Sequence, residues 1–133
     1  MCCIATNEIA RSLGKLNLAL LSECFEQIQT DEVIITQERL EHIKSRHPED
    51  FDYFLMYGKE SIESPDIILK DEKNKATVFM IKRLSETNLN VIVRVALDTD
   101  KDGLKNSVMT FYRLRNRNLE KMMKRHDLLY KAE

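Results

Sequence analysis

Apolar residues recur at helical spacing through the first part of the chain. From Ile9 to Ile28 they stand mostly three or four positions apart, which predicts one long amphipathic helix. A short extended segment follows at Val33 to Ile35, and Thr36 is suited to cap a helix that has to end near Pro48. A further turn or two of helix is expected to stop near Gly58. The first half of the chain is therefore predicted to be mainly helical.

The pattern becomes extended after Pro65. Apolar runs separated by short polar turns predict consecutive strands, which implies an antiparallel meander of about four strands. These runs are Ile67 to Leu69, Ala76 to Leu84, Leu89 to Leu97 and Ser107 to Leu114. The chain then closes with a basic segment whose apolar stripe predicts a final helix. The stripe consists of Leu119, Met122, His126 and Leu129.

Alternation within the strands assigns side chains to the two faces of the predicted sheet. In the third strand every second position from Leu89 to Leu97 is apolar, so Arg94 is expected to point away from the core. In the last strand Thr110 and Tyr112 share one face. The opposite face of that strand is assigned to its neighbour Met109.

These elements predict an α+β fold. N-terminal helices would pack on a curved antiparallel sheet, and a basic C-terminal helix would close the chain. Residues 1–32 are predicted to form an accessory helix and residues 33–133 the main unit. The chain has 133 residues, which is the size of one compact domain with a single core.

Charge is distributed unevenly, although the net charge is only -1. Residues 22–72 contain fourteen acidic and five basic side chains, whereas residues 73–133 contain seven acidic and fourteen basic ones. The second half is therefore the candidate binding half. A simpler interpretation is that these cations only solvate the final helix.

Composition also bears on location. Asn7 and Arg11 precede any long apolar block, so a secretory signal is not expected, and no segment predicts a membrane span. The cysteines are Cys2, Cys3 and Cys24, an odd count that favours reduced thiols. The chain is thus expected to be cytoplasmic and to make no membrane contact.

Two patterns suggest metal sites and fail on inspection. The segment Asp98 to Gly103 imitates the start of a calcium loop, but the closing carboxylate would fall on Met109 and the flanks are predicted strands. His42 and His47 are five residues apart, whereas zinc-binding pairs on helices are usually about four apart. The segment Asp98 to Gly103 is therefore interpreted as a polar hairpin loop, and no metal or cofactor is expected.

The two histidines can instead serve acid–base chemistry. An imidazole titrates near neutral pH, so His42 or His47 could take a proton from a ribose 2′-hydroxyl or return one to a leaving 5′-oxygen. RNA cleavage by this route needs no metal, but it needs groups that bind the phosphate and stabilise its charge. The candidates are Arg46, Lys82, Arg94, Thr110, Tyr112, Arg113 and Arg115. Residue types alone leave open that the histidines are structural, that the cations face solvent, or that Tyr112 stacks on a base.

Four segments together resemble the phage-associated branch of the barnase, EndoU, colicin and RelE-like nuclease superfamily, over about residues 33–131. They read ITQERLEHIKSRHP, IESPDIIL, VIVRVAL and NSVMTFYRLRNRNLEKMMKRHDLLY. The resemblance implies a small metal-independent ribonuclease of the BECR fold, with helices on one face of a curved sheet and RNA on the other. The net charge departs from the basic character of many small ribonucleases, and the first thirty or so residues have no counterpart.

The resemblance also implies roles for particular residues. His42 and His47 stand in its HI…RHP motif and Thr110 in its final strand, with Tyr112 and Arg113 close behind. Arg94 completes the expected catalytic set, but it is added from strand alternation and charge and not from the resemblance. A role as a phage or mobile-element toxin would imply a neutralising immunity or antitoxin partner. The alternative is a catalytically silent module that binds RNA or a phage protein, and the oligomeric state is left open.

Overall fold

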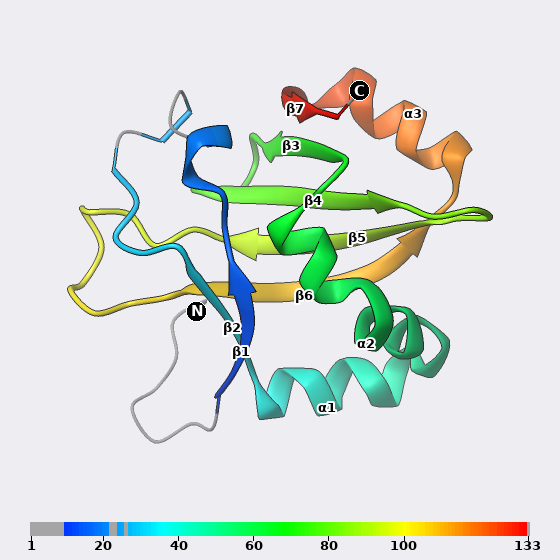
Figure 1. Cartoon of the computed structure of the whole chain (residues 1–133), viewed down its shortest axis with the longest axis horizontal. Helices are drawn as coiled ribbons and strands as arrows, with labels where there is room; N and C mark the ends of the chain where they lie inside the picture. Colours follow the sequence, from blue (N-terminus) through cyan, green and yellow to red (C-terminus); the bar gives the residue numbers. More distant parts are fainter. Residues whose placement is uncertain (1–9, 22–23, 26, 133) are drawn as a thin grey trace.

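A seven-stranded sheet forms the centre of the computed structural model, which describes residues 10–21, 24–25 and 27–132. The strand order is β1-β2-β6-β5-β4-β3-β7 (Figure 1). The strands are β1 (Ala10–Lys15), β2 (Glu32–Thr36), β3 (Ile67–Asp71), β4 (Thr77–Arg83), β5 (Asn88–Arg94), β6 (Asn106–Leu114) and β7 (Asp127–Lys131). The helices are α1 (Gln37–Arg46), α2 (Pro48–Glu63) and α3 (Asn116–Arg125), with a 3-10 turn, η1 (Leu18–Leu20), near the start.

The predicted α+β class and the central meander are confirmed. Strands β3 to β6 follow one another in the sheet as antiparallel neighbours. The expected size of the sheet is wrong, because β1, β2 and β7 extend it beyond four strands. It is also mixed, since β2 runs parallel to β6 at Val33 and Ile34. The helices lie mostly in the middle of the chain and not at its start.

The predicted N-terminal helix is wrong for the described residues. Strand β1 pairs with β2 there, and Gly14 has a φ of +123°, which a helix cannot accommodate. A side chain at Gly14 would also meet Oε2 of Glu63 at 2.8 Å. The apolar spacing has another cause, because Leu16 and Leu21 reach the core from a loop and a turn.

Helix α1 matches its prediction closely, whereas α2 is longer than expected. The Thr36 hydroxyl accepts a hydrogen bond from the Arg39 amide at 3.1 Å and caps α1. Pro48 then occupies the first turn of α2, where a proline costs no hydrogen bond. Gly58 does not end α2, because it is buried inside the helix where a Cβ would lie 2.9 Å from the Phe54 ring.

The predicted closing helix is present only as far as Arg125. The backbone turns to an extended conformation at His126, whose amide donates to the Met122 carbonyl at 3.0 Å. Strand β7 then pairs with β3, for example Leu128 with Leu69. The apolar stripe predicted a helix through Leu129, but the residues after Arg125 form a strand instead. This strand covers the edge of β3 and so protects it.

The two faces of the sheet differ in what covers them. On the face that we call the helix face, Phe54 of α2 stacks on Phe111 of β6 with ring centroids 3.9 Å apart. Figure 1 views the molecule from this side. On the opposite face, which we call the open face, α3 packs through Leu119 against Leu114 and Ile81. The remainder of the open face lies between α3 and the loops at the other end of the strands.

One of the three cysteines lies among the described residues. Cys24 is a half-buried free thiol, and Cys2 and Cys3 lie outside the described residues. Within the described part of the chain, no helix is long and apolar enough to cross a membrane.

Candidate functional site

Helix α1 lies along the outer edge of β6. After its parallel pairing with β6 at Val33 and Ile34, strand β2 leads directly into α1. The Arg39 guanidinium donates to the Met109 carbonyl at 2.7 Å, so α1 satisfies an edge carbonyl that a further strand would otherwise bind. Near the end of β6, Arg113 donates to Asp50 in the first turn of α2 at 2.6 Å. The first contact holds α1, and the second holds the start of α2, beside the second half of β6.

Helix periodicity relates His42 to Arg39, the residue of α1 that contacts β6. Arg39, His42 and Arg46 follow one another at spacings of three and four residues, which places them in one row along the helix. Arg39, the first residue of this row, contacts β6 at Met109, the neighbour of Thr110. His42 lies about 4.5 Å further along the helix axis than Arg39, and Thr110 lies about 3.4 Å beyond Met109. His42 and Arg46 are exposed.

Thr110 and Tyr112 stand on the open face, as alternation predicts. Thr110 is paired with Ile92 and Tyr112 with Asn90. Within the described residues the Thr110 hydroxyl has no hydrogen-bond partner, whereas the Tyr112 ring packs against the apolar cluster under α3. The assignment of Met109 to the helix face is wrong, because the register shifts after Ile92 and Met109 lines a cavity on the open face.

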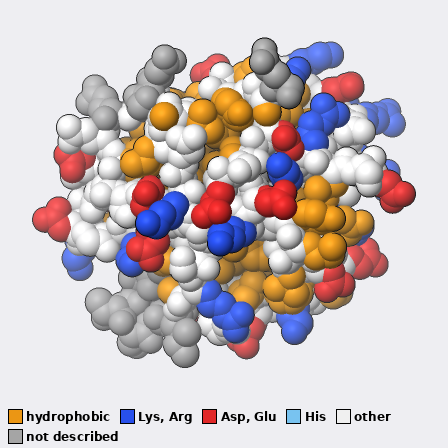
Figure 2. Space-filling model, in the orientation of Figure 1, with side chains coloured by type: hydrophobic (Ala, Val, Ile, Leu, Met, Phe, Trp, Pro, Cys, Tyr) orange, Lys and Arg blue, Asp and Glu red, His pale blue; other side chains and the backbone are white. Residues whose placement is uncertain are grey.

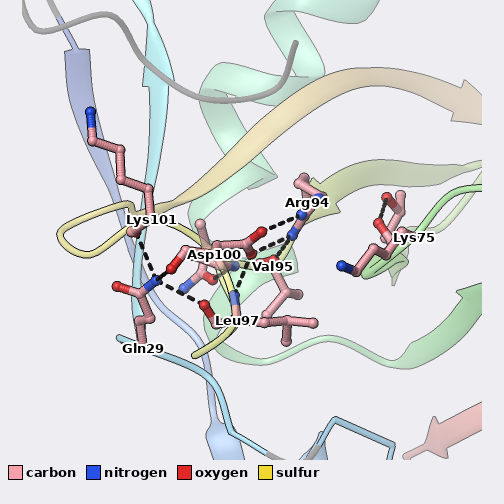
Figure 3. A network of polar contacts seen from close by, with 10 residues as sticks. Gln29, Lys75, Arg94, Val95, Leu97, Asp100 and Lys101 are labelled. Atoms are coloured by element: carbon pink, nitrogen blue, oxygen red, sulfur yellow. Dashed lines mark hydrogen bonds and ion pairs between the residues drawn. The ribbon is translucent and has the colours of Figure 1, made fainter.

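Arg94 is also on the open face, held in place by the loop that follows β5 (Figure 3). Its guanidinium donates to the Asp100 carboxylate at 3.1 and 3.3 Å and to the Val95 carbonyl. The Leu97 amide donates to Asp100 at 2.8 Å, and this bond, followed by Arg94, lowers the pKa of Asp100 despite partial burial. The Gln29 side chain donates to the Leu97 carbonyl at 2.8 Å and secures the same loop. Arg94 is therefore a preorganised cation.

Lys82 and Arg113 lie on the helix face, each beside two carboxylates. Lys82 donates to the Ser64 carbonyl at 3.0 Å, with Glu60 and Asp66 at 3.6 and 3.7 Å. Arg113 binds Glu49 at 2.9 Å in addition to Asp50, and its hydrogen bond to Asp50 is the main cause that raises its pKa. The structure does not bring these two cations together with Thr110.

His47 and Arg115 occupy the ends of helices. His47 stands between α1 and α2, where its amide donates to the Ile43 carbonyl at 2.7 Å and its carbonyl accepts from Phe51 at 3.1 Å. Its imidazole and that of His42 make no hydrogen bond with the described residues. Arg115 precedes α3 and is exposed. Of these, His47 lies nearer to the α1 flank, because it directly follows Arg46.

A cavity on the open face contains groups that the sequence did not single out. It has a volume of about 460 Å³ and includes Asn74 and Lys75 from the turn between β3 and β4. In the sequence these residues are part of a short polar turn between two predicted strands. His126 was expected on an apolar stripe, but its ring packs on Phe79 and its Nδ1 lies 2.8 Å from Glu72.

Within the described ranges, no cluster of three or more His, Cys, Asp or Glu residues is arranged to hold an ion. In the Asp98 to Gly103 loop, the Asp100 carboxylate binds Arg94 and a backbone amide instead.

Comparison with known protein families shows a similarity over most of the chain. A sequence model of the family described as phage-Barnase-EndoU-ColicinE5/D-RelE like nuclease2 matches residues 8–131. This range includes every helix and strand described above. None of the curated proteins and none of the solved structures that were compared matches the chain.

Proposed function

The chain belongs to the phage-Barnase-EndoU-ColicinE5/D-RelE like nuclease family, and from this premise we propose that it is an RNA endonuclease that needs no metal ion. The ribose 2′-hydroxyl attacks the adjacent phosphorus while a base removes its proton. The bond to the 5′-oxygen breaks, and an acid protonates that oxygen. The products are a 2′,3′-cyclic phosphate and a 5′-hydroxyl end.

The observation that carries the proposal is the hydrogen bond from Arg39 of α1 to the Met109 carbonyl, next to Thr110 in β6. This contact supports the proposal, because it aligns a row containing an imidazole with a strand that presents a hydroxyl on the open face. His42 is the first candidate for base or acid. His47, at the end of the same helix, is the candidate for the complementary role.

Groups on the open face and on the flank would bind the phosphate. The Thr110 hydroxyl can donate to a nonbridging oxygen. Arg94 uses two of its nitrogens in the bonds to Asp100 and Val95, so part of its five-donor fork remains for a substrate. Arg46 continues the row from His42, and Tyr112 offers the exposed part of its ring to a base. Arg115 is a more distant candidate for the RNA backbone.

The helix face is less suited to RNA. Figure 2 shows this face, where acidic and basic side chains alternate across the centre and do not form a patch of one charge. Lys82 and Arg113 would have to leave their carboxylates before they could bind a phosphate. The proposal therefore gives them no direct contact with the reacting phosphate.

A toxin role with a neutralising partner is a further part of the proposal. Leu55 and Met56 on α2 are 61% and 68% exposed, and adjacent large apolar side chains at a surface are typical of protein contacts. Growth arrest on expression of the wild type, lost in the variant His42→Ala, is the expected result. Equal growth with both proteins would contradict a nuclease toxin.

A second candidate is a catalytically silent RNA-binding module. It is favoured by one observation, which is that neither His42 nor His47 has a hydrogen-bond partner among the described residues. An acid or base is usually oriented by such a partner. Salt-dependent RNA binding without any cleavage would support this alternative.

The chemistry is tested with an oligonucleotide in which one ribonucleotide interrupts a DNA strand. Cleavage is expected after that ribonucleotide alone, with a cyclic phosphate on the released fragment and no loss of rate in EDTA. The all-DNA strand is the matched control. Cleavage of the control at a similar rate would contradict attack by a 2′-hydroxyl.

A further inference from the structure

The cavity on the open face lies next to the proposed cleavage site. It is bounded by the β3–β4 turn on one side and by Arg94 and Met109 on the other. Its floor includes Ile92, which is the direct partner of Thr110 across neighbouring strands. Paired residues in adjacent strands have Cβ atoms about 5 Å apart. A group bound in the cavity would therefore adjoin a phosphate at Thr110.

The lining combines an apolar floor with hydrogen-bonding walls. Ile92 and Met109 are half-buried and provide the floor, and methionine sulfur makes favourable contacts with aromatic rings. Asn74 donates from Nδ2 to Asp71 at 2.7 Å, which leaves its carbonyl oxygen and one N–H available. A nucleobase has matching properties, because its faces are apolar and its edge carries donors and acceptors. The volume of about 460 Å³ is within the range of small-ligand sites.

The cavity also has a cation that is available for a phosphate. Among the described residues, no carboxylate lies within ion-pair distance of the Lys75 ammonium, although its charge acts on Asp100. Figure 3 shows the Lys75 side chain extending toward the Arg94 network from the turn. Arg94 already has Asp100 as its partner, and its remaining donors are assigned to the reacting phosphate. The Asp71 carboxylate also lines the cavity, but it accepts hydrogen bonds from the Lys73 amide and from Asn74. A second phosphate would therefore be attracted mainly by Lys75.

The turn that carries these groups is held in one conformation. Asp71 accepts from the Lys73 amide at 2.9 Å and from Asn74. Ala76 has a φ of +52°, a left-handed conformation that is unfavourable for a residue other than glycine. Strain of this kind is kept where the surrounding structure fixes it, often at binding sites. The turn therefore presents Asn74 and Lys75 without further ordering.

We propose that this cavity binds the nucleotide next to the cleaved phosphate, with its base over Ile92 and Met109, its edge on Asn74 and its other phosphate on Lys75. This subsite rests on the proposed RNA cleavage. It assigns the turn between β3 and β4 to substrate binding and not to the chemical step. Loss of Lys75 should therefore raise KM and leave kcat nearly unchanged.

The test uses a fluorescein-labelled single-stranded DNA oligonucleotide, which lacks the attacking hydroxyl and can be bound without being cut. The variant Lys75→Ala is compared with Lys73→Ala, which removes the same charge from the same turn outside the cavity, and with Lys75→Arg. Lys75→Ala is expected to raise Kd roughly tenfold and to reduce the slope of log Kd against log salt by about 0.7, the value for one phosphate of a single strand. Lys73→Ala and Lys75→Arg should stay within about twofold of wild type, because neither removes a cation from the cavity.

The outcomes separate the subsite from the cleavage activity. Equal binding by Lys75→Ala and Lys73→Ala, or no binding of the oligonucleotide by wild type, would overturn the subsite. RNA cleavage with an unchanged KM in Lys75→Ala would also overturn it while the nuclease stands. If binding depends on Lys75 but the wild type cuts no RNA, the subsite is supported and the proposed nuclease activity is contradicted.

Discussion

Arg39 and Met109 join α1 to the edge of β6 through a hydrogen bond of 2.7 Å between a guanidinium and a backbone carbonyl. The bond aligns the flank that carries His42. Arg39→Ala should lower the free energy of unfolding by about 1 to 3 kcal/mol, because a partly buried carbonyl loses its donor. It should also slow RNA cleavage, since α1 is no longer fixed beside Thr110. Urea denaturation and a cleavage assay measure both effects, with Arg117→Ala on exposed α3 surface as the control. A stable variant with full activity would show that this bond does not position the site.

Thr110 is the hydroxyl expected to bind the phosphate. The variant Thr110→Val keeps the shape of the side chain and removes its donor, so kcat should fall about 10²-fold, as when one donor to a reacting oxyanion is lost. Thr87→Val is the matched control, because the Thr87 hydroxyl makes only a long bond of 3.4 Å to Leu114 in a loop away from the site. Equal rates for the two variants would remove Thr110 from the mechanism.

The hydrogen bond from the Leu97 amide to Asp100, together with the ion pair between Asp100 and Arg94, makes stability depend on pH. The pKa of Asp100 is lowered in the folded state, so its ionised form stabilises the fold above the ordinary Asp pKa of about 3.9. That contribution disappears as the pH falls through the lowered folded pKa. Asp100→Asn should therefore be less stable than wild type at pH 7 by about 1 to 3 kcal/mol, and the difference should shrink under acid conditions. Denaturant titrations at neutral and acid pH measure it, and a difference independent of pH would contradict the assignment.

Gly58 is a buried glycine inside a helix. Replacement by Ala usually favours an exposed helix by about 1 kcal/mol, but here the new methyl would lie 2.9 Å from the Phe54 ring. Overpacking of this kind costs about 1 to 3 kcal/mol, so Gly58→Ala should be destabilised or unchanged. If denaturant unfolding shows that the free energy of unfolding of Gly58→Ala rises by the full amount expected from helix propensity, Phe54 can move away without cost.

Local patterns were sufficient to predict the centre of the fold. Strands β3 to β6 have apolar side chains and short polar turns, so their order along the chain is also their order in the sheet. Helix α1 was predicted because Thr36 and Pro48 mark its two ends. The segments that failed depend on distant partners. Strand β1 requires β2, and β7 requires β3, and no periodicity within either segment reveals such a pairing.

The candidate site was predictable to the same extent. Alternation placed Arg94, Thr110 and Tyr112 on the open face. Met109 lies there as well because of a register shift, which the residue types do not predict. The ion pairs of Lys82 and Arg113 follow from the path of α2, which the sequence predicted to be shorter. Asn74 and Lys75 belong to an ordinary polar turn, and pairing of the strands is what places that turn beside Arg94.

Catalysis by the histidines of α1 is tested most directly by single-turnover cleavage of an RNA oligonucleotide in EDTA. Wild type is compared with His42→Ala, His47→Ala and the double variant, whose fold is checked by circular dichroism because both side chains are exposed. Wild type should cleave in EDTA, and the double variant should be slower by about 10² to 10⁴, the usual effect of a lost acid or base. A folded double variant that cleaves as fast as wild type, or a wild type that is inactive in EDTA and restored by a metal ion, would contradict the mechanism.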